Sequence, residues 1–69
     1  MTAASIFEKF KQLEPEFAPK IAAYKLSKNK EGNAIFMRDS KGSPYMFIYK
    51  NDSDWAFFGG SMALDYERR

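Results

Sequence analysis

The chain contains neither cysteine nor histidine among its 69 residues. Without cysteine, no disulfide can link parts of the fold and no thiolate can bind a metal. Without histidine, the chain lacks the commonest general base and the commonest metal ligand. A domain of this size hides only about 60% of its unfolded surface. We therefore expect its stability to depend on its apolar core, with self-association as a further source.

Long hydrophobic runs are also missing. No run of about 18 apolar residues occurs that could span a membrane. The opening residues, "MTAASIFEKF", lack the basic start and apolar block of a signal peptide. The net charge of +2 permits an acidic or nucleic-acid partner without predicting either. We therefore expect a cytoplasmic protein without membrane contact.

Motifs that would indicate catalysis or cofactor binding do not occur. The chain has no glycine-rich phosphate loop, nucleophile elbow or metal-ligand spacing. The stretch "NDSD" at 51–54 lacks the glycine and distal glutamate of a calcium loop, and turn formation explains it better. The sequence therefore predicts a protein that is not an enzyme and has neither cofactor nor metal.

The first third of the chain has the periodicity of a helix. Its apolar residues fall within an arc of about 80° when placed on a helical wheel. They are Ile6, Phe10, Leu13, Phe17, Ile21 and Tyr24. Either Thr2 or the pair Ser5 and Glu8 could cap the start.

Proline divides this helical segment. Pro15 removes a backbone donor and disfavours helical geometry at the residue before it, so we expect the first helix to end near Leu13 or Glu14. Pro15 or Pro19 suits the first turn of a second helix that would end near Leu26. A strand over 22–28 is the alternative, because "YKLSK" alternates apolar and polar residues. Two alanines and the continuing stripe favour the helix.

The remaining residues show the period of two that is typical of strands. Four runs, "AIFMR", "YMFIYK", "WAFF" and "SMALDY", are separated by "SKGS", "NDSD" and Gly59-Gly60, all rich in turn formers. The sequence therefore predicts an α+β fold in a single small domain, 1–69. A helical segment of one or two helices (1–28) covers one face of a four-stranded antiparallel meander (34–67).

A register for this meander follows if Lys41-Gly42 and Gly59-Gly60 are two-residue turns. The core face then contains Ile35, Met37, Met46, Ile48, Trp55, Phe57, Met62, Leu64 and Tyr66. The opposite face contains Ala34, Phe36, Arg38, Tyr45, Phe47, Tyr49, Ala56, Phe58 and Ala63. An antiparallel sheet usually turns polar residues to water on its second face, so this aromatic face requires a cover.

Four kinds of cover are compatible with this aromatic face. One helix on each face would make the aromatics ordinary core, whereas stacking of two sheets would make the protein a homodimer. Another protein would suit the enrichment of aromatics and arginine, which is typical of interface centres. Single-stranded nucleic acid would use the alternating rings on 45–49 as stacking planes.

We favour the protein partner, with binding itself as the activity. The hypothesis is a non-catalytic adaptor or inhibitor, of the kind found among phage and plasmid accessory proteins, with single-stranded nucleic acid as the alternative. The predicted partner-binding residues are Phe36, Arg38, Lys41, Tyr45, Phe47 and Tyr49. Their rings would be desolvated by the partner, and the two cations would pair with its carboxylates.

Overall fold

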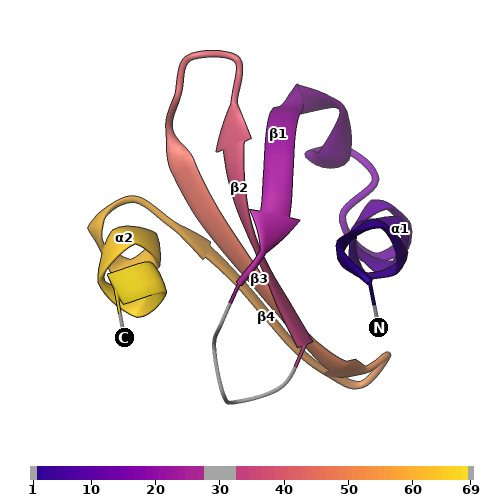
Figure 1. Ribbon diagram of the computed structural model, residues 1–69. Coiled ribbons are helices and arrows are strands. Elements are labelled where there is room, and N and C mark those ends of the chain that lie inside the picture. Colours follow the sequence, from indigo (N-terminus) through magenta and orange to yellow (C-terminus); the bar gives the residue numbers. More distant parts are fainter. Residues whose placement is uncertain (1, 28–32, 69) are drawn as a thin grey trace.

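The computed structural model describes residues 2–27 and 33–68 and has the predicted α+β class. Helix α1 (Ala3–Leu13) and the 3₁₀ turn η1 (Ala18–Lys20) precede four strands, and helix α2 (Ser61–Arg68) follows them (Figure 1). The strands are β1 (Ile21–Leu26), β2 (Asn33–Asp39), β3 (Pro44–Asn51) and β4 (Asp54–Gly59). They form one antiparallel sheet in the order β1-β2-β3-β4.

Helix α1 begins and ends where its sequence predicts. The Ser5 amide donates to Thr2 Oγ1 at 3.1 Å, and the Thr2 amide donates to Ser5 Oγ at 3.0 Å. The capping box therefore joins Thr2 to Ser5 rather than Ser5 to Glu8. At the other end the Glu14 amide donates to the Phe10 carbonyl at 2.8 Å, and Pro15 follows.

The predicted second helix is wrong, and the alternative strand is found in its place. Only η1 is helical, and β1 then pairs with β2. Strand pairing still brings Tyr24 onto α1, where its ring stacks on Phe7 with centroids 4.3 Å apart. An extended segment can therefore bring some of the same apolar residues onto the core whose spacing favoured a helix. Residue 28 of the alternative lies outside the described residues.

The predicted fourth strand is also wrong, because "SMALDY" lies within α2. Gly60 has φ +72°, which a residue with a side chain rarely adopts, and it turns the chain out of the sheet instead of into a hairpin. Its amide donates to the Pro44 carbonyl at 3.1 Å, and its carbonyl accepts from the Leu64 amide at 3.2 Å. Periodicity cannot separate a strand from a short helix in a run of six residues.

The register of β3 differs by one residue from the prediction. Ile35 lies opposite Phe47 rather than Ile48. The cause is the β2–β3 turn, where the Asp39 amide donates to the Ser43 carbonyl at 3.1 Å and Gly42 has φ +84°. Counted from the Asp39–Ser43 pair, three residues (40–42) therefore connect the strands instead of two, and every side chain of β3 moves to the other face of the sheet.

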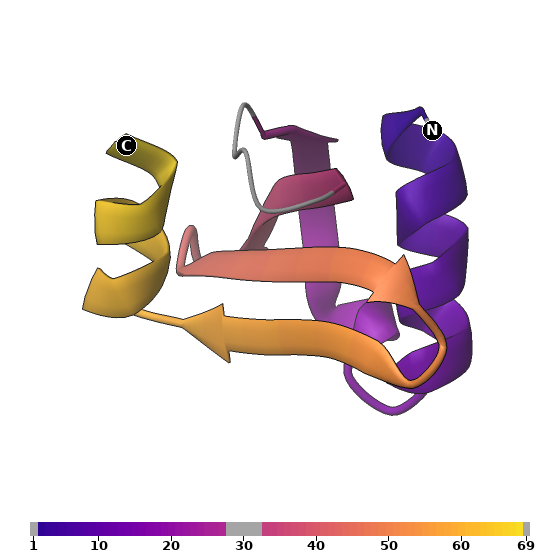
Figure 2. The same cartoon turned by 90° about the horizontal axis from the view of Figure 1, so that it is seen from below.

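Two cores result, one on each face of the sheet (Figure 2). The α1 core contains Ile6, Phe10, Ala18, Ile35, Met37, Phe47 and Tyr49. The α2 core contains Ala34, Phe36, Met46, Ile48 and Ala63. One helix on each face is thus the arrangement observed, and it corrects the prediction that the helical cover lies on one face only.

Candidate functional site

The six predicted partner-binding residues do not share one surface. Tyr45, Phe47 and Tyr49 face α1, because β3 is shifted by one residue. Phe47 has no exposed area, and its ring centroid lies 5.1 Å from that of Phe10. Phe36 and Arg38 point to the opposite face, whereas Lys41 lies in the exposed β2–β3 turn.

Phe36 forms the floor of a different arrangement. Lys25 Nζ lies 5.7 Å from the centre of its ring and Arg38 Cζ lies 5.2 Å from it. The phenyl ring is only 6% exposed, whereas both cationic residues are exposed. The ring therefore holds two cations at the surface through cation–π attraction rather than offering a plane for stacking.

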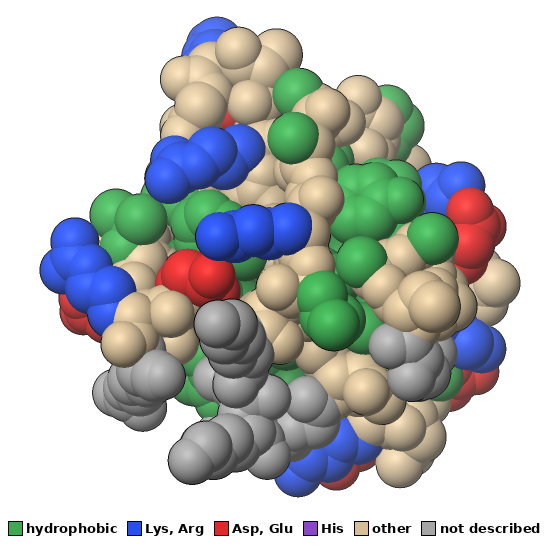
Figure 3. Space-filling view, in the orientation of Figure 1, with side chains coloured by type: hydrophobic (Ala, Val, Ile, Leu, Met, Phe, Trp, Pro, Cys, Tyr) green, Lys and Arg blue, Asp and Glu red, His purple; other side chains and the backbone are tan. Residues whose placement is uncertain are grey.

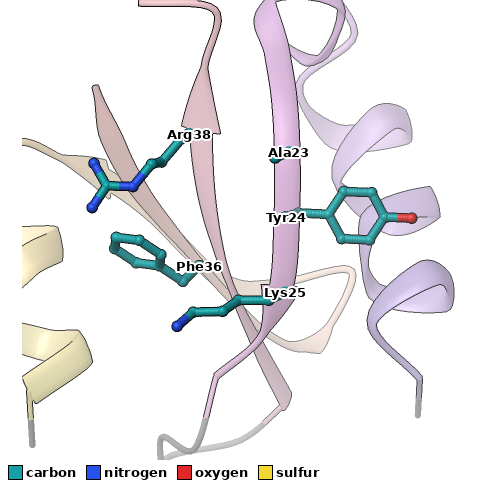
Figure 4. Close-up of a pocket in the computed structure, with 5 residues that line it drawn as sticks. All are labelled: Ala23, Tyr24, Lys25, Phe36 and Arg38. Carbon is teal, nitrogen blue, oxygen red and sulfur yellow. The ribbon is translucent and has the colours of Figure 1, made fainter. Parts of the chain in front are cut away.

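A hollow of about 330 Å³ lies beside these residues, lined by Ala23, Tyr24, Lys25, Phe36 and Arg38. Figure 4 shows Arg38, Phe36 and Lys25 on the α2 side of the sheet and Tyr24 pointing towards α1. Ala23 lies opposite Arg38 in the β1–β2 register, so both side chains lie on the same face. Because alanine is short, it leaves open space between Arg38 and the edge of the sheet.

The two cations of the hollow have different partners. Lys25 Nζ lies 3.3 Å from Glu67 Oε1 of α2, and Ser27 Oγ donates to Glu67 Oε2 at 3.0 Å. Arg38 Nη1 donates to the Gly42 carbonyl at 2.6 Å, which fixes the guanidinium by one of its nitrogens. Basic side chains accordingly lie beside acidic and hydrophobic surface on the face seen in Figure 3.

Among the described residues no strand pairs with the outer edge of β1, which is called the free edge, and this edge borders the hollow. The Ser27 amide donates to the Ala34 carbonyl at 2.9 Å, so these two residues form a hydrogen-bonded pair. Such pairs alternate along an antiparallel ladder. Tyr24 and Leu26 therefore direct their amides and carbonyls away from β2, towards the outer edge. Their side chains are 39% and 53% exposed.

Aspartates organise the turns at the two ends of β3. The Ser43 amide lowers the pKa of Asp39, whose other carboxylate oxygen accepts a hydrogen bond from the Tyr45 hydroxyl at 2.9 Å. The Tyr49 hydroxyl lowers the pKa of Asp52 by donating to it at 2.5 Å, and Lys9 of α1 lies 3.5 Å from the same oxygen. These contacts stabilise the turns and connect one of them to α1.

Two further features do not occur in residues 2–27 and 33–68. Within these ranges no three acidic side chains are grouped so that they could bind a metal ion. Neither helix described there has the length and apolar character needed to cross a membrane.

Comparison of the chain with protein-family models, curated proteins and solved structures found no match. The candidate site is therefore inferred from its geometry alone. Sequence reasoning missed Ala23, Tyr24, Lys25 and Leu26, because it assigned them to a helix. The alternation in "YKLSK" was the signal that could have found them.

Proposed function

We propose that this protein is a non-catalytic protein-binding module, an adaptor or inhibitor, that pairs the free edge of β1 with an extended segment of another protein. The observation that carries the proposal is this edge, with outward backbone groups and exposed side chains at Tyr24 and Leu26. Main-chain hydrogen bonds to a sheet edge supply affinity, and neighbouring pockets supply specificity.

The edge of β1 carries two of the devices with which natural sheets protect an edge strand. A register shift between Ile21 and Ala23 distorts one end of the strand, and Lys25 places a charge near its middle. From Ala23 to Leu26, however, pairing with β2 is regular. Unpaired strand edges of this kind template the addition of another strand.

A partner of different sequence suits this edge better than a second copy. If two β1 strands paired antiparallel and centred on Lys25, the two Lys25 side chains would face each other, and both Arg38 side chains would lie on the same face of the extended sheet. Like charges at facing positions oppose strand pairing. The edge therefore favours an extended segment that carries negative charge.

Single-stranded nucleic acid has less support than this protein partner. Its hypothesis required the rings of Tyr45, Phe47 and Tyr49 as stacking planes, and these rings face α1. The ring of Phe36 lies on the opposite face beneath the side chains of Lys25 and Arg38, so it does not offer a base an open stacking plane.

The test is selection of binding peptides from a random library, followed by N-methylation of one peptide at successive positions. Strand addition predicts that methylation at alternate positions weakens binding about tenfold, because every second amide donates to β1. Loss at no position, or at consecutive positions alike, would contradict the proposal.

Two variants examine the protein side of the same hydrogen bonds. Leu26→Pro removes an amide that faces outwards, which edge strands tolerate, and Leu26→Ala is the matched control that keeps the amide. We expect equal melting temperatures and weaker peptide binding by the proline variant. Equal affinities would show that the Leu26 amide is not used.

A further inference from the structure

We propose that the hollow over Ala23 receives a glutamate side chain of the added strand, and that Arg38 binds its carboxylate. This inference rests on the proposed function and specifies the chemistry of the partner. The occupant is an acidic extended segment of another protein, and the argument for it is the match between its charge and the cations of the hollow.

The sheet geometry sets the distance that the side chain must cover. Neighbouring strands lie about 4.8 Å apart, so a strand added to β1 lies about 10 Å from β2. The residue opposite Ala23 would point to the same face as Ala23 and Arg38. Ala23 is too short to fill the space between them, whereas a glutamate and an arginine together span it. An aspartate would reach less far.

The charges of the hollow direct the carboxylate to Arg38. Glu67 already neutralises Lys25 at 3.3 Å. Arg38 donates to the Gly42 carbonyl through Nη1, and a guanidinium carries five N–H donors in a planar fork. Contact with the Phe36 ring also holds the guanidinium, whose Cζ lies 5.2 Å from the centre of the ring. The guanidinium is therefore oriented before binding, and its remaining donors suit a carboxylate.

The position of Glu67 supports the same specificity. Its carboxylate accepts from Ser27 and pairs with Lys25, so this face of the sheet already holds one carboxylate from α2. A second carboxylate, bound to Arg38, would give each of the two cations, Lys25 and Arg38, a carboxylate partner. A basic side chain in the hollow would instead meet the guanidinium of Arg38, which adds discrimination by repulsion.

The experiment is a charge exchange on a peptide selected as above. Replacing the glutamate opposite Ala23 by glutamine, or making Arg38→Gln in the protein, should weaken binding about 10- to 100-fold. Arg38→Glu should weaken binding further and should recover when the peptide carries lysine at that position. Lys41→Glu, which changes the same charge in the neighbouring turn, is the control and should have a small effect.

A second pair of variants tests the space rather than the charge. Ala23→Leu fills the hollow and should weaken binding about tenfold or more. Ala22→Leu adds the same side chain at the neighbouring exposed position and should leave affinity within about threefold. Thermal melts of every variant separate loss of binding from loss of folding.

The outcomes distinguish this inference from the proposal on which it rests. Selected peptides that show alternate N-methyl sensitivity but no acidic preference, or no recovery with Arg38→Glu, would overturn the glutamate assignment and leave strand addition standing. Peptides without the alternate pattern would overturn strand addition itself.

Discussion

The two faces of the sheet are covered to different extents. Helix α1 has 11 residues, and with Phe17 and the η1 turn it covers its face from β1 to β4. Helix α2 has 8 residues and packs mainly on β3 and β4. On the α2 face the helix reaches β1 through the Glu67 side chain, which contacts Lys25 and Ser27, and the hollow lies beside that contact.

This difference explains the abundance of aromatic residues. Most of the rings expected at an interface build the α1 core, where Phe10 contacts Phe47 and Phe57 at centroid distances of 5.1 and 4.9 Å. In a chain of 69 residues, a core on each face of the sheet buries more apolar area than a core on one face would. The candidate binding surface keeps two of the chain's rings, Tyr24 and Phe36, beside its cations.

The largest effect on stability should come from the α1 core. Phe47→Ala removes a fully buried ring at the centre of the sheet and should lower the free energy of unfolding by about 3–5 kcal/mol. Urea denaturation measures the loss, with Phe47→Leu as a control that should retain a larger part of the stability. A Phe47→Ala protein that unfolds like the parent would place this ring outside the core.

The α2 face should respond to added volume. Ala63 is fully buried where α2 meets the sheet, so Ala63→Leu should cost about 1–3 kcal/mol through overpacking. Met62→Leu is the control, since Met62 is 65% exposed and its replacement should leave the melting temperature unchanged. If Ala63→Leu is neutral, α2 packs more loosely than the structure shows.

The sequence predicted the class of fold and the limits of α1, because local signals determine both. A capping pair at Thr2 and a proline after Glu14 act within a few residues of the helix ends. The segment 21–26 and the run "SMALDY" were assigned wrongly. Their structures depend on partners elsewhere, β2 for one and the open face of β3 and β4 for the other.

The candidate site was harder to predict than the fold. One additional residue in the turn before β3 exchanged the faces of Tyr45, Phe47 and Tyr49, and turn length is not encoded by periodicity. Arg38 and Phe36 were correctly placed on one face with each other. Their neighbour Ala23 could not be found, because a small residue indicates a hollow only when the side chains around it are known.

Acidification should weaken the two turns at the ends of β3, whose aspartates accept hydrogen bonds from Tyr45 and Tyr49 on the α1 face. The folded-state pKa values of Asp39 and Asp52 are lowered from the ordinary 3.8, by the Ser43 amide and the Tyr49 hydroxyl respectively. Their contribution to stability is therefore fully present above pH 3.8 and is lost as the pH falls through the lowered values.

The measurement is the urea midpoint of the parent and of an Asp39→Asn, Asp52→Asn double variant at neutral pH and below pH 3.8. The parent should lose more stability on acidification than the double variant, so the two proteins should become more alike in acid. Asp54→Asn removes the same charge at the first residue of β4, directly after the turn that contains Asp52, and serves as the control. A double variant as acid-sensitive as the parent would contradict the assignment.

The smallest effect should come from the free edge, and there two facing residues give a direct comparison. Leu26 lies opposite Ile35 in the β1–β2 register, yet Leu26 is 53% exposed whereas Ile35 has no exposed area. Ile35→Ala should cost about 2–5 kcal/mol, because it leaves a cavity in the α1 core. Leu26→Ala should change the free energy of unfolding by about 0.5 kcal/mol or less, as is usual for surface positions.

Chemical denaturation at several protein concentrations measures the free energies of unfolding of both variants. A large, concentration-dependent loss for Leu26→Ala would show that a second copy covers β1, and the edge would then not be free to receive the strand of another protein.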